Sequence, residues 1–153
     1  METTCTLVRY ENRPALVLRR RASVNDLPQI LEQAFGLLGQ HLAELGEYPV
    51  DAPYIGYFNM DMQNLDLEIG FPVARPLPGK GEIQSGALPA GESVTCIFTG
   101  PYNEVSVAYE ALTGWMKKNG RVPTGVAYEH YLNDPHTTPP AQLQTRIEFP
   151  LKG

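Results

Sequence analysis

The sequence is poor in the features that mark several classes of protein. It has two cysteines among 153 residues, Cys5 and Cys96, and they form no Cys-x-x-Cys pair, so neither a disulfide framework nor a cysteine zinc site is expected. No apolar run approaches the roughly 18 residues of a membrane-spanning helix, and the opening METTCTL lacks a cationic and apolar leader. We therefore expect a cytoplasmic protein with free thiols and no membrane partner.

Basic residues are also scarce. Lys and Arg total 12 against 17 Asp and Glu, a formal net charge of -5 that argues against binding to nucleic-acid backbone. Hydrophobic residues make up 42% and charged residues 19%, a balance typical of one globular domain. The histidines, His41, His130 and His136, have no metal-ligand spacing with either cysteine. We therefore predict no metal and no cofactor.

Two segments have the apolar period of a helix. The first covers residues 23–45 and ends at Gly46; the second covers residues 103–119 and ends at Gly120. Gly36 and Gly39 are interpreted as points of close packing against a sheet, since glycine inside a helix otherwise costs up to about 1 kcal/mol relative to alanine. The expected inward residues are Leu27, Ile30, Leu31, Ala34, Leu38, Leu42 and Leu45 in the first helix, and Val105, Ala108, Tyr109, Leu112, Trp115 and Met116 in the second.

The remaining segments favour strands. Alternation of apolar and polar residues is clearest at residues 65–73 and 143–151. Further strands are expected at residues 7–10, 15–21, 54–59, 93–99 and 126–132.

The strands and helices form two versions of one pattern. IGFPV (69–73) matches IEFPL (147–151), and the two helices stop at equivalent places. We predict an α+β fold made of a duplicated strand, helix, strand, strand unit, with an extra strand at a position that the sequence does not fix. Its two helices would pack on a mostly antiparallel sheet, with a pseudo-two-fold axis and a central groove. The single domain would comprise repeat one (about 7–75), a Pro- and Gly-rich connector (about 76–91) and repeat two (about 92–153).

The stretch YEHYLND (128–134) places an acid among aromatic residues. In a strand, the side chains of Glu129 and Tyr131 point to one face of the sheet and the side chain of His130 points to the other. A carboxylate buried there needs a partner, because an uncompensated charge is costly to bury. The alternative is a solvated face, where Glu is usually found.

The second half carries a family resemblance. LPAGESVTCIFTGPYNEVSVAYEALTGWMKKNG (88–120), followed by YEHYLND and a closing RIEFPL, resembles the GyrI-like (gyrase-inhibitor-like) small-molecule-binding family. That family includes effector-binding domains of multidrug-sensing bacterial transcription regulators. The resemblance implies a groove between two halves that holds hydrophobic, often cationic, ligands over aromatic side chains and a buried glutamate.

Carried onto this sequence, the family glutamate falls on Glu129, which would be the counter-charge for a ligand. Pairing YFNMD (57–61) with HYLND (130–134) makes Gly56 the counterpart of Glu129 and predicts the opposite wall. Tyr109 and Trp115 of the second helix could line the groove, and Phe35 and His41 are their rough counterparts in the first helix. The alternative to a ligand-binding role for these four residues is simple core packing. The candidate ligand-binding residues are Glu129, Tyr131, Tyr54, Phe58, Gly56, Trp115 and Tyr109.

Three functions are compatible with these residues. The first is a stand-alone protein that senses or sequesters a small-molecule ligand. The second is a hydrolase of strained or reactive small molecules, with Glu129 as general base and Tyr131 beside it. The third is a protein-interaction module such as a gyrase inhibitor. No helix-turn-helix pattern is found, so we expect no direct nucleic-acid partner, while a protein partner and a monomeric or homodimeric state are left open.

Overall fold

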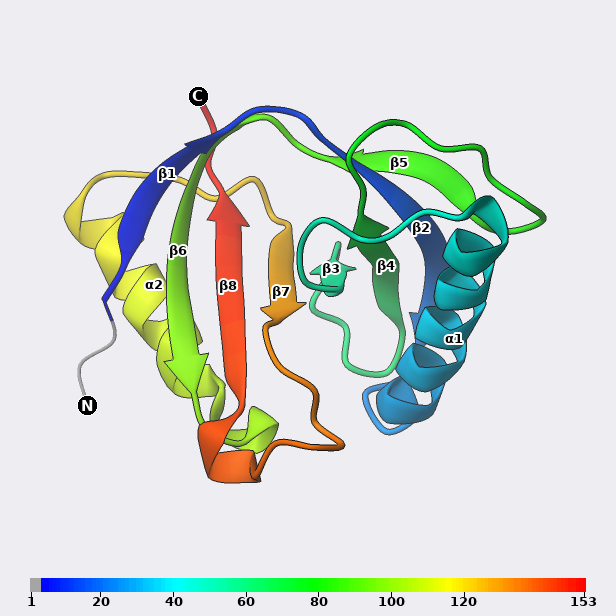
Figure 1. The fold of residues 1–153 in the computed structure, drawn as a ribbon. Coiled ribbons are helices and arrows are strands. Elements are labelled where there is room, and N and C mark those ends of the chain that lie inside the picture. The colour runs from blue at the N-terminus through cyan, green and yellow to red at the C-terminus, as the bar shows by residue number, and fades with distance from the viewer. Residues whose placement is uncertain (1–3) are drawn as a thin grey trace. The chain divides into compact units, whose positions relative to one another are not determined.

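The computed structural model describes residues 4–153. These residues form two compact units. Unit 2 is the continuous segment Asn12–Pro89, and unit 1 joins the residues up to Glu11 with Ala90–Gly153. Each unit holds one long helix and four strands (Figure 1).

Unit 2 is an antiparallel sheet covered by helix α1. Its sheet has the order β5-β2-β4-β3, and α1 lies against β2 and β4. The elements are β2 (Arg13–Ala22), α1 (Leu27–Leu45), β3 (Tyr54–Tyr57), β4 (Leu65–Pro72) and β5 (Gln84–Leu88).

Unit 1 repeats this arrangement with helix α2. Its antiparallel sheet has the order β1-β6-β8-β7, and α2 lies against β6 and β8. The elements are β1 (Thr6–Tyr10), β6 (Gly91–Thr99), the short 3-10 turn η1 (Tyr102–Glu104), α2 (Ser106–Lys118), β7 (Ala127–Tyr131), the 3-10 turn η2 (Pro140–Gln142) and β8 (Gln144–Pro150).

The shared strand order confirms the α+β fold and its duplicated unit. One ring pair shows how close the correspondence is. Tyr109 on α2 packs on Phe149 with ring centroids 5.5 Å apart at 53°. Phe35 on α1 packs on Phe71 at 5.5 Å and 59°. Phe71 and Phe149 occupy the same place in IGFPV and IEFPL, so helix and strand meet alike in both units.

In the chain, the edge strand of each unit lies directly before the first strand of the other unit. β1 comes before β2 in the chain but pairs with β6, and β5 comes before β6 but pairs with β2. Sequence analysis missed β5, which lies inside the segment 76–91 that was expected to be a connector. Its glycine, Gly86, lets the strand approach closely, because a Cβ there would lie 3.0 Å from the side chain of Val17.

The helix ends follow from local chemistry. Helix α1 begins at Leu27 rather than near Ser23, because the backbone N–H of Asp26 donates to the carbonyl of Ser23 in a preceding turn. Its stop at Gly46 is confirmed: Gly46 has φ 68°, and its N–H donates to Ala43. Helix α2 begins at Ser106, after η1, rather than near residue 103.

The interpretation of two glycines in α1 was wrong. A Cβ added at Gly36 or Gly39 would meet no atom within 4 Å, so neither residue lies in close contact with the sheet. Packing against the sheet therefore does not require glycine at either position.

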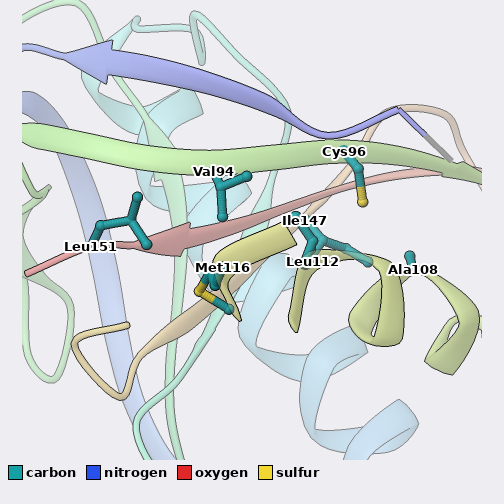
Figure 2. Packing of buried hydrophobic residues seen from close by; sticks show 7 residues of the cluster. All are labelled: Val94, Cys96, Ala108, Leu112, Met116, Ile147 and Leu151. Atoms are coloured by element: carbon teal, nitrogen blue, oxygen red, sulfur yellow. The ribbon is translucent and has the colours of Figure 1, made fainter. Parts of the chain in front are cut away.

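The core of unit 1 lies between α2 and the sheet (Figure 2). Leu112 of α2 and Ile147 of β8 are fully buried at its centre. Truncating such a leucine to alanine costs about 2–5 kcal/mol. The full cluster is Val94, Cys96, Ala108, Leu112, Met116, Ile147 and Leu151.

The two cysteines lie in this unit. Thr6 of β1 pairs with Thr95 of β6, so the next position in the same register places Cys5 opposite Cys96. Both thiols are free in this structure. Burial, with a smaller contribution from Cys5, raises the pKa of Cys96 to about 12.

None of the helices within residues 4–153 is both long and apolar enough to cross a membrane. No group of three or more His, Cys, Asp or Glu side chains in the same residues is arranged to hold a metal ion.

Candidate functional site

Glu129 lies on the face of the unit 1 sheet that α2 covers. It stands in the middle of β7 directly opposite Ile147 of β8, and opposed residues of an antiparallel pair point to the same side. Ile147 belongs to the core beneath α2. Only 9% of Glu129 is exposed. The alternative of a solvated face is therefore wrong.

Two tyrosine hydroxyls compensate the buried carboxylate. The hydroxyl of Tyr131, two residues along β7, donates to Oε1 of Glu129 at 3.0 Å. The hydroxyl of Tyr109, on α2, donates to Oε2. A hydrogen bond to a charged group contributes about 1.5–3 kcal/mol, whereas a bond between neutral groups contributes about 0.5–1.5 kcal/mol. The helix and the strand thus hold the acid from two directions.

A third tyrosine lies near Glu129. The ring of Tyr102, in η1, meets the ring of Tyr131 edge-on, with centroids 5.5 Å apart at 73°. Burial raises the pKa of Tyr102, and the charges of Asp134 and Glu129 add to the effect. Sequence analysis missed this residue, although it is the tyrosine of the Gly-Pro-Tyr motif before the second helix.

Trp115 has a packing role in the described structure. It is partly buried and packs against the core cluster of unit 1. Tyr109 packs against the same cluster but also reaches Glu129 with its hydroxyl. The sequence could not separate these two residues, because both follow the same apolar period of the helix.

The candidates from the first repeat belong to unit 2. Tyr54 is fully buried, and its hydroxyl donates to Oε1 of Glu68 at 3.1 Å. Burial raises the pKa of Glu68, while the Tyr54 hydrogen bond and the charge of Arg19 oppose that rise. Phe58 lies beneath the Arg19 guanidinium, 4.4 Å from its ring centroid. Gly56 is buried on β3, opposite Glu68 of β4.

The repeat alignment behind these candidates was off by one residue. In β7, Glu129 stands opposite Ile147; in β3, Ile55 stands opposite Ile69. Since Ile69 and Ile147 match in IGFPV and IEFPL, Ile55 and not Gly56 is the counterpart of Glu129. A slip of one residue exchanges the two faces of a strand. Tyr54 and Gly56 therefore lie on the face of their own sheet opposite to the one that α1 covers.

A second buried acid lies on the other face of the unit 1 sheet. Glu148 of β8 is fully buried, as is His130 of β7, whose Nε2 lies 3.4 Å from Oε2 of Glu148. Oε1 accepts from the Tyr10 hydroxyl at 2.8 Å and from Nε of Arg146 at 3.2 Å. Glu148 was not predicted as a buried acid, because it occupies a polar position in the polar and apolar alternation of β8, and such positions usually face solvent. The cationic Arg146 beside it neutralises a charge that would otherwise be costly to bury.

Comparison with known protein families identifies the family of the chain. The model of the GyrI-like small molecule binding domain matches residues 3–152. The chain belongs to this family. A comparison with curated proteins gives no match.

Solved structures of other proteins show the same fold. The C-terminal domain of EcmrR is 22% identical, with a TM-score of 0.80 over 99% of both chains. In the EcmrR–DNA complex the TM-score is 0.85 over 98% of this chain, which spans 57% of the EcmrR chain.

Two further relatives are more distant. A hydrolase from Listeria innocua is 13% identical, with a TM-score of 0.71 over 97% of this chain and 91% of its own. SAV2435 bound to tetraphenylphosphonium is 12% identical, with a TM-score of 0.59 over 100% of this chain and 95% of its own. At these identities the likeness establishes the fold.

Proposed function

We propose that this GyrI-like protein binds a hydrophobic cation or amphipathic molecule in the cytoplasm, with Glu129 as the counter-charge, and thereby senses or sequesters it. The observation that carries this proposal is a carboxylate only 9% exposed and held by the hydroxyls of Tyr109 and Tyr131. Both of these donors are neutral hydroxyls. A cationic ligand beside the carboxylate would add a charge–charge attraction that hydroxyls do not supply.

The aromatic side chains supply the second part of recognition. Tyr131 and Tyr102 meet edge-on beside Glu129, and a cation over the face of such a ring gains about 0.5–2 kcal/mol. SAV2435, which shares the fold, is bound to tetraphenylphosphonium, a lipophilic cation. This supports the same class of ligand here. The proposed ligand contacts are Glu129, Tyr131, Tyr109 and Tyr102, while Tyr54, Gly56, Phe58 and Trp115 stay predictions.

The test compares a cation with a neutral molecule of similar shape. Glu129→Gln keeps the volume and one acceptor but removes the charge. We expect tetraphenylphosphonium to bind about ten- to a hundredfold more weakly, the equivalent of one charged hydrogen bond. Neutral triphenylphosphine oxide should change little. Calorimetric titration of both compounds measures this, and an equal loss for both would refute the counter-charge role.

A hydrolase is the second candidate, supported by the Listeria innocua hydrolase that shares the fold. Here Glu129 would take a proton from water, and the Tyr109 and Tyr131 hydroxyls would orient the Glu129 carboxylate. Glu129→Gln would then bind substrate nearly normally but lose turnover, because an amide is no base. Following a strained neutral epoxide, styrene oxide, by mass spectrometry in wild type and in Glu129→Gln separates binding from hydrolysis to the diol.

A further inference from the structure

Two connections of unit 1 meet at one end of its sheet. Strands β6 and β7 both pair antiparallel with β8, so they run in the same direction and finish at the same end. The turn η1 follows β6, and residues 132–143 follow β7 (Figure 1). The backbone N–H of Gly100 donates to the carbonyl of Leu143 at 2.8 Å, so the two connections are joined at their bases.

Asp134 stands in the second of these connections, three residues after Tyr131. Its Oδ1 accepts the backbone N–H of His136 at 2.8 Å, and its carbonyl accepts those of Thr137 and Thr138 at 3.2 and 3.0 Å. Hydrogen bonds of this kind fix a turn. The residue is exposed, and within residues 4–153 its other carboxylate oxygen, Oδ2, takes part in no hydrogen bond or ion pair. That oxygen is therefore open to a ligand.

Tyr102 lies between this acid and Glu129. Its ring meets the Tyr131 ring edge-on, with centroids 5.5 Å apart, and the Tyr131 hydroxyl donates to Glu129. Burial raises the pKa of Tyr102, and the negative charges of Asp134 and Glu129 raise it further. Both carboxylates therefore lie near the Tyr102 hydroxyl, because the interaction between charges weakens with distance. Tyr102 is 38% exposed, so this place is open to solvent.

The sequence around these residues carries negative charge only. Residues 98–116 and 122–145 contain four acids and no Lys or Arg. The two lysines of α2 are in its last turn, about 15–20 Å along the helix axis from its first residue. Arg146 follows on β8, but its side chain points to the opposite face of the sheet from Ile147, where it donates to Glu148.

We propose that Asp134 is a second anionic contact of the Glu129 site, and that the ligand class this site prefers is a flat aromatic dication. One positive centre would lie beside Glu129 and the other beside Asp134. The aromatic body between them would contact the rings of Tyr102 and Tyr131. This inference rests on the proposed function and adds to it the charge of the ligand.

Methyl viologen and its monoquaternary form, 1-methyl-4-(4-pyridyl)pyridinium, test the second contact. They differ by one methyl group and one positive charge, so the ratio of their affinities measures the effect of the second charge. We expect wild type to bind the dication about two- to fivefold more tightly at low ionic strength, the range of one exposed ion pair. Calorimetric titration measures both affinities. Equal affinities in wild type would overturn the proposal.

A matched pair of substitutions locates the contact. Asp134→Asn removes the charge but keeps the oxygen that accepts from His136, so the turn should fold unchanged. Asp61→Asn is the control. Asp61 is an exposed acid between β3 and β4 of unit 2, and its Oδ1 accepts the backbone N–H of Gln63 at 3.1 Å in the same way. Each variant lowers the negative charge of the chain by one.

The affinity ratio should fall to about one in Asp134→Asn and keep its wild-type value in Asp61→Asn. An unchanged ratio in the first variant, or an equal fall in both, would refute the contact. Glu129→Gln separates this inference from the proposed function. If Glu129→Gln leaves the affinity of the monoquaternary compound unchanged, the proposed function fails and this inference fails with it. If Glu129→Gln weakens that compound while Asp134→Asn keeps the ratio, only the second contact is wrong.

Discussion

Removing the Tyr109 hydroxyl should destabilise the empty protein without weakening its binding of cations. Tyr109→Phe keeps the ring that packs on Phe149 but deletes one of two donors to Glu129. The lost bond to a charged group is worth about 1.5–3 kcal/mol. At about 2–4 °C per kcal/mol for a chain of this size, the melting temperature should fall by about 3–12 °C.

Thermal unfolding followed by circular dichroism measures this change. The control is Tyr48→Phe, the same chemical change at a residue that is 83% exposed, which should alter stability by less than about 0.5 kcal/mol. With one donor fewer, Glu129 is less compensated, so tetraphenylphosphonium affinity should hold or rise. If Tyr109→Phe lowers the melting temperature no more than Tyr48→Phe does, the hydroxyl does not support the buried acid.

Three further outcomes are expected. Gly70→Ala should destabilise by about 1–3 kcal/mol in urea unfolding, because its Cβ would lie 2.8 Å from the fully buried Tyr54 ring; unchanged stability would contradict this contact. Burial raises the pKa of Glu68, so the folded protein binds that proton more tightly, and wild type gains stability as pH falls through this pKa. Glu68→Gln should therefore be the more stable form at neutral pH, and its advantage should shrink under mild acid; a constant difference would refute the raised pKa. Diamide should slowly join Cys5 to Cys96, since opposed strand positions suit a disulfide but burial disfavours the Cys96 thiolate; mass spectrometry should show the bond, and Cys5→Ser should lack it.

The helical period and the repeat were strong enough to predict most of the fold. Both helices have a continuous apolar strip, and IGFPV and IEFPL mark the same strand in each unit. The strand β5 was missed because Gln84–Leu88 has neither strong alternation nor large apolar residues. It exists through its pairing with β2, a tertiary interaction that local sequence does not express.

The acid of the candidate site could be predicted from the sequence, but the strand position that corresponds to it in the first repeat could not. Glu129 drew attention as a charge among aromatic residues, the family resemblance implied that it is buried, and its burial is confirmed. Its counterpart in the first repeat was misplaced by one residue, because YFNMD was aligned with HYLND on residue identity. The strand pairing instead makes Ile55 the counterpart of Glu129. Glu148 and His130 are paired across strands, and no spacing along the chain announces such a pair.

The exchange of first strands has a consequence for how such a chain can be divided. A polypeptide with a single repeat would carry a leading strand that its own sheet does not use, and would leave its second strand as an open edge. Two copies would complete each other by swapping those strands, as in a domain-swapped dimer. The present chain makes the same swap within one molecule, through β1 on β6 and β5 on β2. Cut between β4 and β5, its two halves would each keep a strand that pairs with the sheet of the other, so they should reassemble when mixed.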